Sequence, residues 1–399
     1  RRAAPGRGTT RLRGLLVAVQ VAASLILVLG TGLLARSLVA LQTRDTGVDT
    51  DRVSYLRADW SRVQLEGDQV RAVLDEVRQR MEALPGVTRA AVVSRLPAQR
   101  SGTTTTEVEG YTPPAGTAAV EMPFTVVGDG YFEVMGISVV AGRLFNEDDV
   151  PDGPGASILI NEATARRFYG DADPLGRRMR GQGSEEWTRT VVGVVENTPV
   201  SSLGESDRPM FYFSTRQTSF APGYVVARTD GDPAALLEPM RREMGALSVS
   251  PTVTAQGTLD SHFGATLATP RLAARAMGAF SLLALLLAGL GVYAVVSFSV
   301  QRRTSELGIR MALGAERSRV VHMVVREVVG VVLVGLAVGL GLSALAAPRL
   351  VGILYGVPAL DPLAFGGAVV VLLVVAGGAA YVPARRAAAA DPVEALRVS

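Results

Sequence analysis

Side chains able to carry out acid–base or nucleophilic chemistry are few in this 399-residue chain. A histidine lies beside an acid and a hydroxyl at one place, Asp260-Ser261-His262. A catalytic triad depends on the spatial arrangement of its three groups, which adjacency along the chain does not provide. The sequence has no cysteine, so a thiolate nucleophile is excluded as well. We therefore predict a structural role for His262.

Two acidic runs, Glu147-Asp148-Asp149 and Glu185-Glu186, are the candidates for binding a hard cation. A calcium loop needs oxygen ligands spaced along it, and neither run has that spacing. His262 and His322 are the only two histidines, which excludes a His-rich metal centre. We predict that both acidic runs are solvated loops and that the chain holds no metal.

The basic residues exclude one class of nucleotide-binding protein, because all 40 of them are arginine. The loop that cradles ATP phosphates in Walker-type ATPases requires a lysine. The triplet Gly128-Asp129-Gly130 predicts a turn, and nothing near it indicates a bound phosphate. We predict that the chain is not itself an enzyme, and a membrane-tethered enzyme is the least favoured of three function classes.

Four long uncharged runs predict membrane-spanning helices at residues 14–35, 276–301, 328–348 and 362–384. A helix needs about 20 apolar residues to cross the hydrocarbon core, and each run reaches that length. The chain is 48% hydrophobic with a mean hydropathy of +0.28, which excludes an intrinsically disordered protein. A signal peptide is disfavoured for the first run, because the apolar region of such a peptide has only about 7–15 residues.

The placement of arginine predicts the orientation of the four helices. The segments 1–13, 302–327 and 385–399, which share one side, carry net charges of +5, +3 and +1. On the other side, 36–275 has a net charge of −6 and 349–361 is neutral. Basic segments stay in the cytoplasm. We therefore predict a basic leader, a loop and a tail in the cytoplasm, a large extracytoplasmic domain at 36–275 and a short outer loop.

Small residues in the predicted helices favour close packing over ion conduction. Gly335 and Gly339 are four residues apart in the third run, and Gly289 lies in the second. Such spacing lets helix backbones approach closely in a membrane. None of the four runs contains an ionisable side chain, and such side chains usually mark ion and proton pathways. This argues against a channel or a secondary transporter built from this chain alone.

The predicted extracytoplasmic domain has a strand–helix–strand pattern at each end. The first unit lies at about 53–95 and the second at about 223–255. They flank a strand-rich inserted subdomain at about 100–220, with a short helix capped by Asn161 and a loop at 102–106. We therefore predict a split α+β sandwich.

The loop between the second and third helices mixes charged and apolar residues. Residues 301–325 read QRRTSELGIRMALGAERSRVVHMVV, which is too short for a domain. Gly308 and Gly314 permit tight turns or close backbone approach. From composition alone, two interpretations stay open. The segment is either a solvated basic connector or a short helix through which an internal partner pushes on both membrane helices.

The stretch RRTSELGIRMALGA at 302–315 resembles the signature E-[IL]-G-[IL]-R-x-A-L-G-A of permease subunits in the MacB/FtsX-like family of ABC transporters. Four other segments, 11–42, 128–149, 158–179 and 381–397, resemble the family's first helix and stalk, its periplasmic core domain and its tail. The resemblance covers nearly the whole chain.

The resemblance implies an α-helical membrane protein with four transmembrane helices and a large extracytoplasmic α+β domain, the MacB-like periplasmic core domain, between helices 1 and 2. This is the order derived above from length and charge. The arginine-rich leader at 1–13 resembles the junction inside duplicated permeases. We therefore expect the chain to be the C-terminal half of a duplicated permease, or a homologue of that half.

The resemblance also implies a function, the permease subunit of an ABC-type system for export or mechanotransmission. Such proteins act as a homodimer or with a second permease half on a cytoplasmic ABC ATPase, which binds ATP and Mg²⁺, while the permease binds no cofactor. An extracytoplasmic adaptor or substrate protein is a further expected partner, and nucleic acid is not. The implied ATPase-coupling residues are Glu306, Leu307, Gly308, Ile309, Arg310, Leu313 and Gly314. The alternative is a membrane-anchored sensor or scaffold whose outer domain binds a peptide, lipoprotein or cell-wall enzyme without transport.

Overall fold

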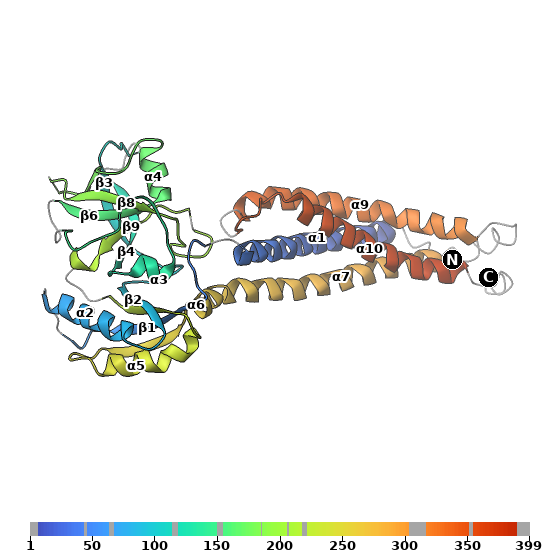
Figure 1. The fold of residues 1–399 in the computed structure, drawn as a ribbon. Coiled ribbons are helices and arrows are strands. Elements are labelled where there is room, and N and C mark those ends of the chain that lie inside the picture. The colour runs from blue at the N-terminus through green and yellow to red at the C-terminus, as the bar shows by residue number, and fades with distance from the viewer. Residues whose placement is uncertain are drawn as a thin grey trace. The chain divides into compact units, whose positions relative to one another are not determined.

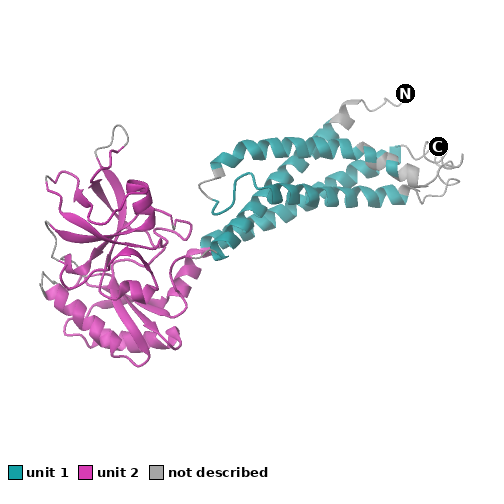
Figure 2. Cartoon of the chain, turned by 45° about the horizontal axis from the view of Figure 1, so that its top comes forward, with its two compact units in different colours: residues 1–43, 269–399 teal, residues 44–268 magenta. Residues whose placement is uncertain are grey.

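The computed structural model describes residues 7–43, 46–63, 68–113, 119–149, 155–184, 186–205, 207–217, 222–302, 317–350 and 354–388. The chain forms two compact units, which Figure 2 colours separately. One unit combines residues 1–43 with 269–399, and the other consists of residues 44–268. We refer to them as the helix unit and the outer unit.

The helix unit is built from four long helices that run alongside one another (Figure 1). They are α1 (Arg7–Thr43), α7 (Ala268–Arg302), α9 (Arg317–Leu350) and α10 (Pro362–Ala388). Judged by length and composition over the described residues, all four are able to cross a membrane. Their core is a stripe of buried residues that recurs every fourth position, for example Val17, Val21 and Leu25 on α1. α10 contributes mainly alanine to this core, which lets α1 and α9 lie close to it.

The outer unit contains a first lobe in which two strand–helix–strand segments interleave. Its elements are β1 (Val53–Asp59), α2 (Asp68–Glu82), β2 (Val87–Val93), β10 (Tyr224–Thr229), η2 (Pro233–Leu236), α5 (Leu237–Gly245), β11 (Thr252–Thr258) and α6 (Leu259–Thr266). The strand order is β11-β1-β10-β2, and all neighbours are antiparallel. Each predicted unit thus has parallel strands with one strand of the other unit between them, which is the split arrangement.

The second lobe is a closed barrel. Its elements are β3 (Gly102–Val108), β4 (Val120–Val127), β5 (Val139–Gly142), β6 (Ala156–Asn161), α4 (Glu162–Tyr169), β7 (Arg178–Gly181), β8 (Arg189–Val195), β9 (Phe211–Ser214) and η1 (Thr215–Gln217). The short helix α3 (Tyr131–Met135) follows β4 in the chain but packs on β2 and β10 of the first lobe. The strands follow the order β4-β3-β7-β8-β6-β9, and β9 pairs in parallel with β4 to complete the ring. Closure leaves these six strands without a free edge. β5 pairs with β8 outside the ring.

The two lobes of the outer unit are joined where β2 ends beside β4. A single register pair, Val93 with Val127, links the two strands. Next to it, the amide of Ser94 donates to Val126 O at 2.9 Å, and the amide of Gly128 donates to Val92 O at 2.8 Å. These bonds place the Gly128–Gly130 turn, predicted from the sequence, directly at the junction of the lobes.

One predicted loop is wrong. Residues 102–106 form most of β3, which pairs with β4 through the register Gly102–Phe124 to Thr106–Val120. Threonine is β-branched and fits the pleated surface of a sheet, so a run of four threonines suits a strand better than a loop. The predicted cap at Asn161 is confirmed, because its side chain accepts a hydrogen bond from the amide of Thr164 at the start of α4.

The acidic run at 147–149 is solvated only in part. Glu147 and Asp148 are exposed, but Asp149 is buried. Its carboxylate accepts two bonds from the Arg143 guanidinium, at 2.8 and 3.1 Å, and one from the amide of Asn146 at 2.7 Å. The hydroxyl of Ser157 on β6 donates to it as well. Asp149 therefore ties the chain after β5 to the barrel, and the prediction of a solvated loop is wrong for this residue.

Replacement of Asp149 by Asn should lower the free energy of unfolding of the outer unit by about 1–2 kcal/mol at pH 7, because charge-assisted hydrogen bonds become neutral ones. Burial raises the pKa of Asp149, but the hydrogen bonds from Arg143, Ser157 and Asn146 outweigh burial and hold that pKa below its usual value. The charged form therefore stabilises the fold above about pH 4, and this contribution is lost as the pH falls through the lowered pKa.

Tryptophan fluorescence measures this effect on the full chain, since both tryptophans, Trp60 and Trp187, lie in the outer unit. Asp149→Asn should lower the midpoint of urea unfolding at pH 7, and the difference from the unsubstituted chain should shrink as the pH is taken below 4. Equal midpoints at pH 7 would show that the carboxylate contributes nothing.

Candidate functional site

The predicted coupling segment connects two helices that extend through the helix unit. α7 ends at Arg302 and α9 begins at Arg317. Residues Glu306, Leu307, Gly308, Ile309, Arg310, Leu313 and Gly314 all lie outside the described residues. The sites that the structure does describe are therefore the helix contacts on either side of this segment and the surfaces of the outer unit.

Arginines gather around aromatic side chains at the end of the helix unit from which this segment starts. The Arg13 guanidinium of α1 lies 4.1 Å from the centre of the Phe298 ring on α7, and that of Arg302 lies 6.0 Å from it. Arg386 of α10 donates to the hydroxyl of Tyr293 at 3.1 Å. Cation–π contacts of this kind fix the direction of the arginines without a counter-ion. They join α1, α7 and α10 at their basic ends.

Two of the glycines singled out in the sequence bring α1 and α9 into backbone contact. A Cβ atom at Gly335 would lie 2.6 Å from the carbonyl oxygen of Ala18, and one at Gly339 would lie 3.1 Å from Cα of Ala22. No side chain fits at either position without moving a helix. At the third glycine, Gly289 on α7, a Cβ would lie 3.4 Å from Val375, which is an ordinary contact.

α7 contacts α1 through hydroxyl groups. The Ser24 Oγ of α1 lies 2.9 Å from the carbonyl oxygen of Ala284, to which it donates. About two helical turns further along α1, Thr31 Oγ1 and Ser281 Oγ are 2.7 Å apart. Ser24 and Ser281 are buried. Sequence reasoning missed this contact, because hydroxyl residues in an apolar run were treated only as uncharged.

An ion pair between a buried carboxylate and an exposed arginine holds the segment before α10 against the C-terminal part of α1. Asp361 Oδ2 lies 3.3 Å from Arg36 Nη2, and its side chain is 6% exposed against 43% for the arginine. Asp361 also caps α10 by accepting the amide of Ala364 at 2.8 Å. Beside it, the buried Ser37 Oγ accepts the amide of Tyr355 at 2.8 Å. We call this set of contacts, made by Arg36, Ser37, Tyr355 and Asp361, the outer clasp.

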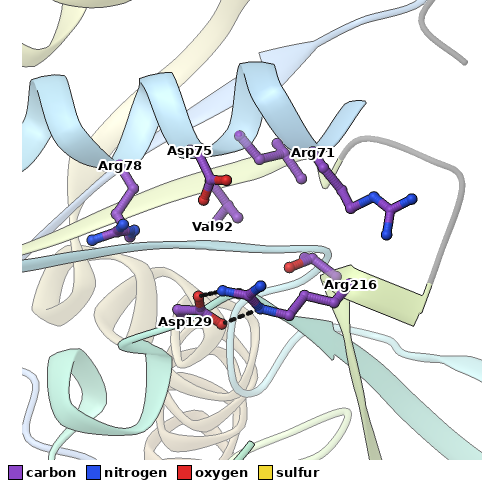
Figure 3. A pocket seen from close by; sticks show the side chains of 9 residues that line it. Arg71, Asp75, Arg78, Val92, Asp129 and Arg216 are labelled. Carbon is purple, nitrogen blue, oxygen red and sulfur yellow. Dashed lines mark hydrogen bonds and ion pairs between the residues drawn. The ribbon is translucent and has the colours of Figure 1, made fainter. Parts of the chain in front are cut away.

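The outer unit has a small cleft between its lobes, with about 40 Å³ of space accessible to water (Figure 3). One wall is the face of α2 that carries Arg71, Asp75 and Arg78, and the other is formed by Asp129 and Arg216. Figure 3 shows the guanidinium of Arg216 turned onto the Asp129 carboxylate, with a shortest distance of 2.6 Å. Arg78 pairs in turn with Glu82 at 2.9 Å. Since Arg78 and Arg216 are already paired with carboxylates, the cleft has the character of a polar junction between lobes.

The side chains considered for catalysis do not form a site. His262 Nε2 lies 3.0 Å from the carbonyl oxygen of Pro97, and the Ser261 hydroxyl donates to Thr258 O at 2.7 Å. The His262 ring also packs edge-on against Tyr55. Both candidate groups are thus held by the backbone, in line with a structural role. Among the described residues, no group of three or more acidic or histidine side chains is placed to bind a metal.

Comparison with known protein families gives two matches. The FtsX-like permease C-terminal model matches residues 278–392, and the MacB-like periplasmic core domain model matches residues 19–243, which is more than half of the chain. The chain belongs to the MacB/FtsX-like permease family. It is thus a membrane protein of a permease family, with a large extracytoplasmic domain, which is the outer unit.

Relatives of this MacB/FtsX-like permease include two proteins named macrolide export ATP-binding/permease protein MacB. That of Neisseria meningitidis serogroup A is 26% identical, over 68% of this chain and 42% of its own length. That of Hahella chejuensis is 27% identical, over 70% of this chain and 43% of its own length. The chain therefore spans less than half the length of these curated relatives. The crystal structure of the periplasmic region of MacB from Actinobacillus actinomycetemcomitans matches 55% of this chain and 94% of that one at 14% identity, with a TM-score of 0.36.

The two family matches cover the helices whose contacts are described above. The FtsX-like match includes α9, α10 and the predicted coupling segment, and the MacB-like match begins within α1. The outer clasp was not predicted, although its two charged members flank predicted spans and carry opposite signs. The distribution of arginine predicted that Arg36 and Asp361 lie on the same, outer side of the membrane. Their opposite charges on the same side are the signal that could have identified the ion pair.

Proposed function

We propose that this chain couples ATP binding and hydrolysis by a cytoplasmic ABC ATPase to motion of its extracytoplasmic domain, for export or mechanotransmission. The observation that carries the proposal is the ELGIRMALGA sequence at 306–315, which lies between α7 and α9 along the chain. A partner bound there would act on two helices at once. ATP binding by that partner would then shift a two-state equilibrium of the membrane helices, which the outer unit follows.

Within the coupling segment, polar and apolar residues take different roles. Glu306 and Arg310 make the polar contacts to the ATPase, while Leu307, Ile309 and Leu313 form the apolar face that is seated on it. Gly308 and Gly314 allow close backbone approach. ATP and Mg²⁺ are held by the ATPase, because this chain has no lysine with which to build a P-loop.

The assembly we propose contains two permease units on a pair of ATPase domains, as a homodimer or with a second permease half. The named relatives are ATP-binding/permease proteins, so the ATPase is either a separate subunit or joined to a permease chain. Both termini lie in the cytoplasm and the outer unit lies outside a bacterial inner membrane, as the arginine-rich segments 1–13, 302–327 and 385–399 favour.

The helix unit is better suited to transmitting motion than to forming a pathway for a substrate between its helices. The four predicted spans carry no ionisable side chain, and the helices pack through glycine, alanine and hydroxyl contacts. An ion or a charged substrate crossing between them would lack compensating charges. Specificity for a substrate or partner would then reside in the outer unit.

Substitution of Leu307 and Ile309 together by Asp tests this proposal. The two charges should abolish both co-purification of the ABC ATPase and the chain's effect on ATP hydrolysis, because the apolar face can no longer be buried. The matched control is Thr304→Asp with Ser305→Asp, which adds the same charge to the same loop outside the signature. Tryptophan fluorescence verifies that the outer unit stays folded. If the double variant retains the ATPase as well as the control does, the coupling role is wrong.

A further inference from the structure

The contacts inside the helix unit fall into two physically different kinds. Those that join α1 to α9 and α10 involve backbone approach and a buried carboxylate. Those that join α1 to α7 are made through side chains, namely the hydroxyl groups of Ser24 and Thr31, which have a second acceptor, and the Arg13–Phe298 contact. We infer that α1, α9 and α10 form one rigid body, and that α7 shifts against α1 at the Ser24 and Thr31 contacts. This inference rests on the proposed function, in which the shift is what ATP binding drives.

The α1–α9 contact cannot slide. At Gly335 a Cβ would lie 2.6 Å from Ala18 O and 2.8 Å from Val21 Cβ, so the helix backbones interlock at this depth. Moving α9 along α1 would bring the larger side chains of neighbouring turns onto the α1 backbone. Packed surfaces of this kind have discrete arrangements and resist continuous displacement.

The outer clasp holds the same body together at its other end. Asp361 is buried, so separation from Arg36 would leave a carboxylate without its counter-charge at low dielectric. Gly356 adds a steric contact, since its φ of +66° points a would-be Cβ to within 3.2 Å of Ala40 Cβ. α9 and α10 are therefore fixed to α1 both within the bundle, through Gly335, and at its outer end.

The α1–α7 contact has a lower cost of rearrangement. Ser24 Oγ, which donates to Ala284 O on α7, also lies 2.8 Å from Gln20 O in its own helix. Thr31 Oγ1, the partner of Ser281, lies 2.9 Å from Leu27 O in the same way. Both hydroxyls keep a carbonyl acceptor four residues back when α7 moves away. Neither Ser24 nor Thr31 is left without an acceptor by the shift, and this lowers the cost of the change on the α1 side of the contact.

The position of α7 in the chain gives the shift a consequence. α7 follows the outer unit at Ala268 and leads into the coupling segment after Arg302, whereas α1 leads into the outer unit after Thr43. α7 is also the least buried of the four helices. Displacement of α7 along α1 would change the relative position of the two points from which the outer unit is held. Motion at the coupling segment is thereby converted into motion of the outer unit.

Disulfide cross-links test the inference, and the chain has no cysteine of its own to interfere. The locking pair is Thr31→Cys with Ser281→Cys, whose side-chain oxygens lie 2.7 Å apart. The control pair is Gly32→Cys with Ala364→Cys, for which the Cβ atoms would lie 3.9 Å apart, within the range of disulfides. The two pairs differ by one residue on α1, but the first joins α1 to α7 and the second joins α1 to α10.

In nanodiscs with the co-purified ABC ATPase, the oxidised locking pair should reduce the chain's stimulation of ATP hydrolysis by about tenfold, and a reductant should restore it. The oxidised control pair should leave the rate within twofold of the reduced form. Equal rates for both pairs, whether both unaffected or both inhibited, would overturn the division into a rigid body and a moving α7.

A second measurement separates failure of this inference from failure of the proposed function, because it needs no ATPase. Spin labels at the exposed positions Val39 and Leu272 report the α1–α7 distance in the chain alone, and labels at Val39 and Leu345 report α1–α9. The first distance distribution should be broad or bimodal, over about one helical turn of 5 Å, and the second narrow. Two narrow distributions would contradict the inference even if an ATPase binds.

Discussion

Gly335→Leu should lower the free energy of unfolding of the helix unit by about 3 kcal/mol. The reason is steric, since the Cβ alone would lie 2.6 Å from a backbone oxygen of α1, and the backbone has no alternative rotamer. Leucine has a higher helix propensity than glycine, so the local helix itself would gain about 1 kcal/mol. The net decrease in the free energy of unfolding therefore reports the cost of moving α1 away from α9.

Gly341→Leu is the matched control for this substitution, because a Cβ at Gly341 in the same helix meets no atom within 4 Å. Circular dichroism at 222 nm during SDS unfolding follows mainly the four long helices, with a smaller signal from the short helices of the outer unit, and tryptophan fluorescence reports the outer unit alone. Gly335→Leu should shift the helix transition alone, and Gly341→Leu should shift neither to lower denaturant. If the two variants unfold alike, the close approach of α1 and α9 is wrong.

Loss of the Arg36 side chain should cost the helix unit about 3 kcal/mol, the lower end of the range for removal of one partner of a buried ion pair. The lower end applies because Arg36 is itself 43% exposed, whereas the Asp361 side chain is 6% exposed. In Arg36→Ala the carboxylate of Asp361 stays buried with the α10 amide as a remaining donor. Most of the loss in stability comes from the charge of Asp361, which no longer has a counter-ion.

A second substitution at Asp361 separates charge from capping. Asn keeps an oxygen that accepts the amide of Ala364 but carries no charge, so Arg36→Ala with Asp361→Asn should recover about half of the loss. The same helix transition is measured for the two single variants and for the double variant. A double variant that is less stable than Arg36→Ala would mean that the ion pair is not what holds the outer clasp.

The membrane helices could be predicted from the sequence because one physical requirement dominates them. A run of about 20 uncharged residues has few other stable environments, so residues 14–35 and 362–384 identify α1 and α10 with little dependence on context. The split lobe was also predictable, since the helical stripe that includes Val73 and Val77 faces β1 and β2 in the core. Each of these patterns is local.

The parts that could not be predicted depend on contacts between distant segments. The strand at 102–108 is defined by its pairing with β4 and β7, and threonine alone does not decide between a strand and a loop. Asp149 was assigned to a solvated loop because its neighbours are acidic, but Arg143 and Ser157 withdraw it from solvent. Closure of the barrel by the parallel pairing of β9 with β4 has no signal in either strand by itself.

The helix contacts explain how one chain can be both firmly packed and mobile. Interlocked glycines and the Arg36–Asp361 ion pair fix three helices, and in our inference the back-bonded hydroxyls let α7 shift against α1 at the Ser24 and Thr31 contacts. Apolar packing alone would not distinguish the fixed helices from the moving one. In a membrane, a leucine side chain is as stable against lipid as against a neighbouring helix. A permease that transmits motion needs both behaviours in one helix unit.

The most direct test of the account is association with an ABC ATPase through residues 306–315. The chain is purified in detergent from cells that contain their own cytosolic ATPases, once with this segment intact and once with it replaced by a Gly/Ser linker of equal length. The account predicts that an ABC ATPase is retained by the intact chain and lost from the linker variant. Retention by both forms, or by neither while an extracytoplasmic protein co-purifies with both, would contradict it and favour an anchored scaffold.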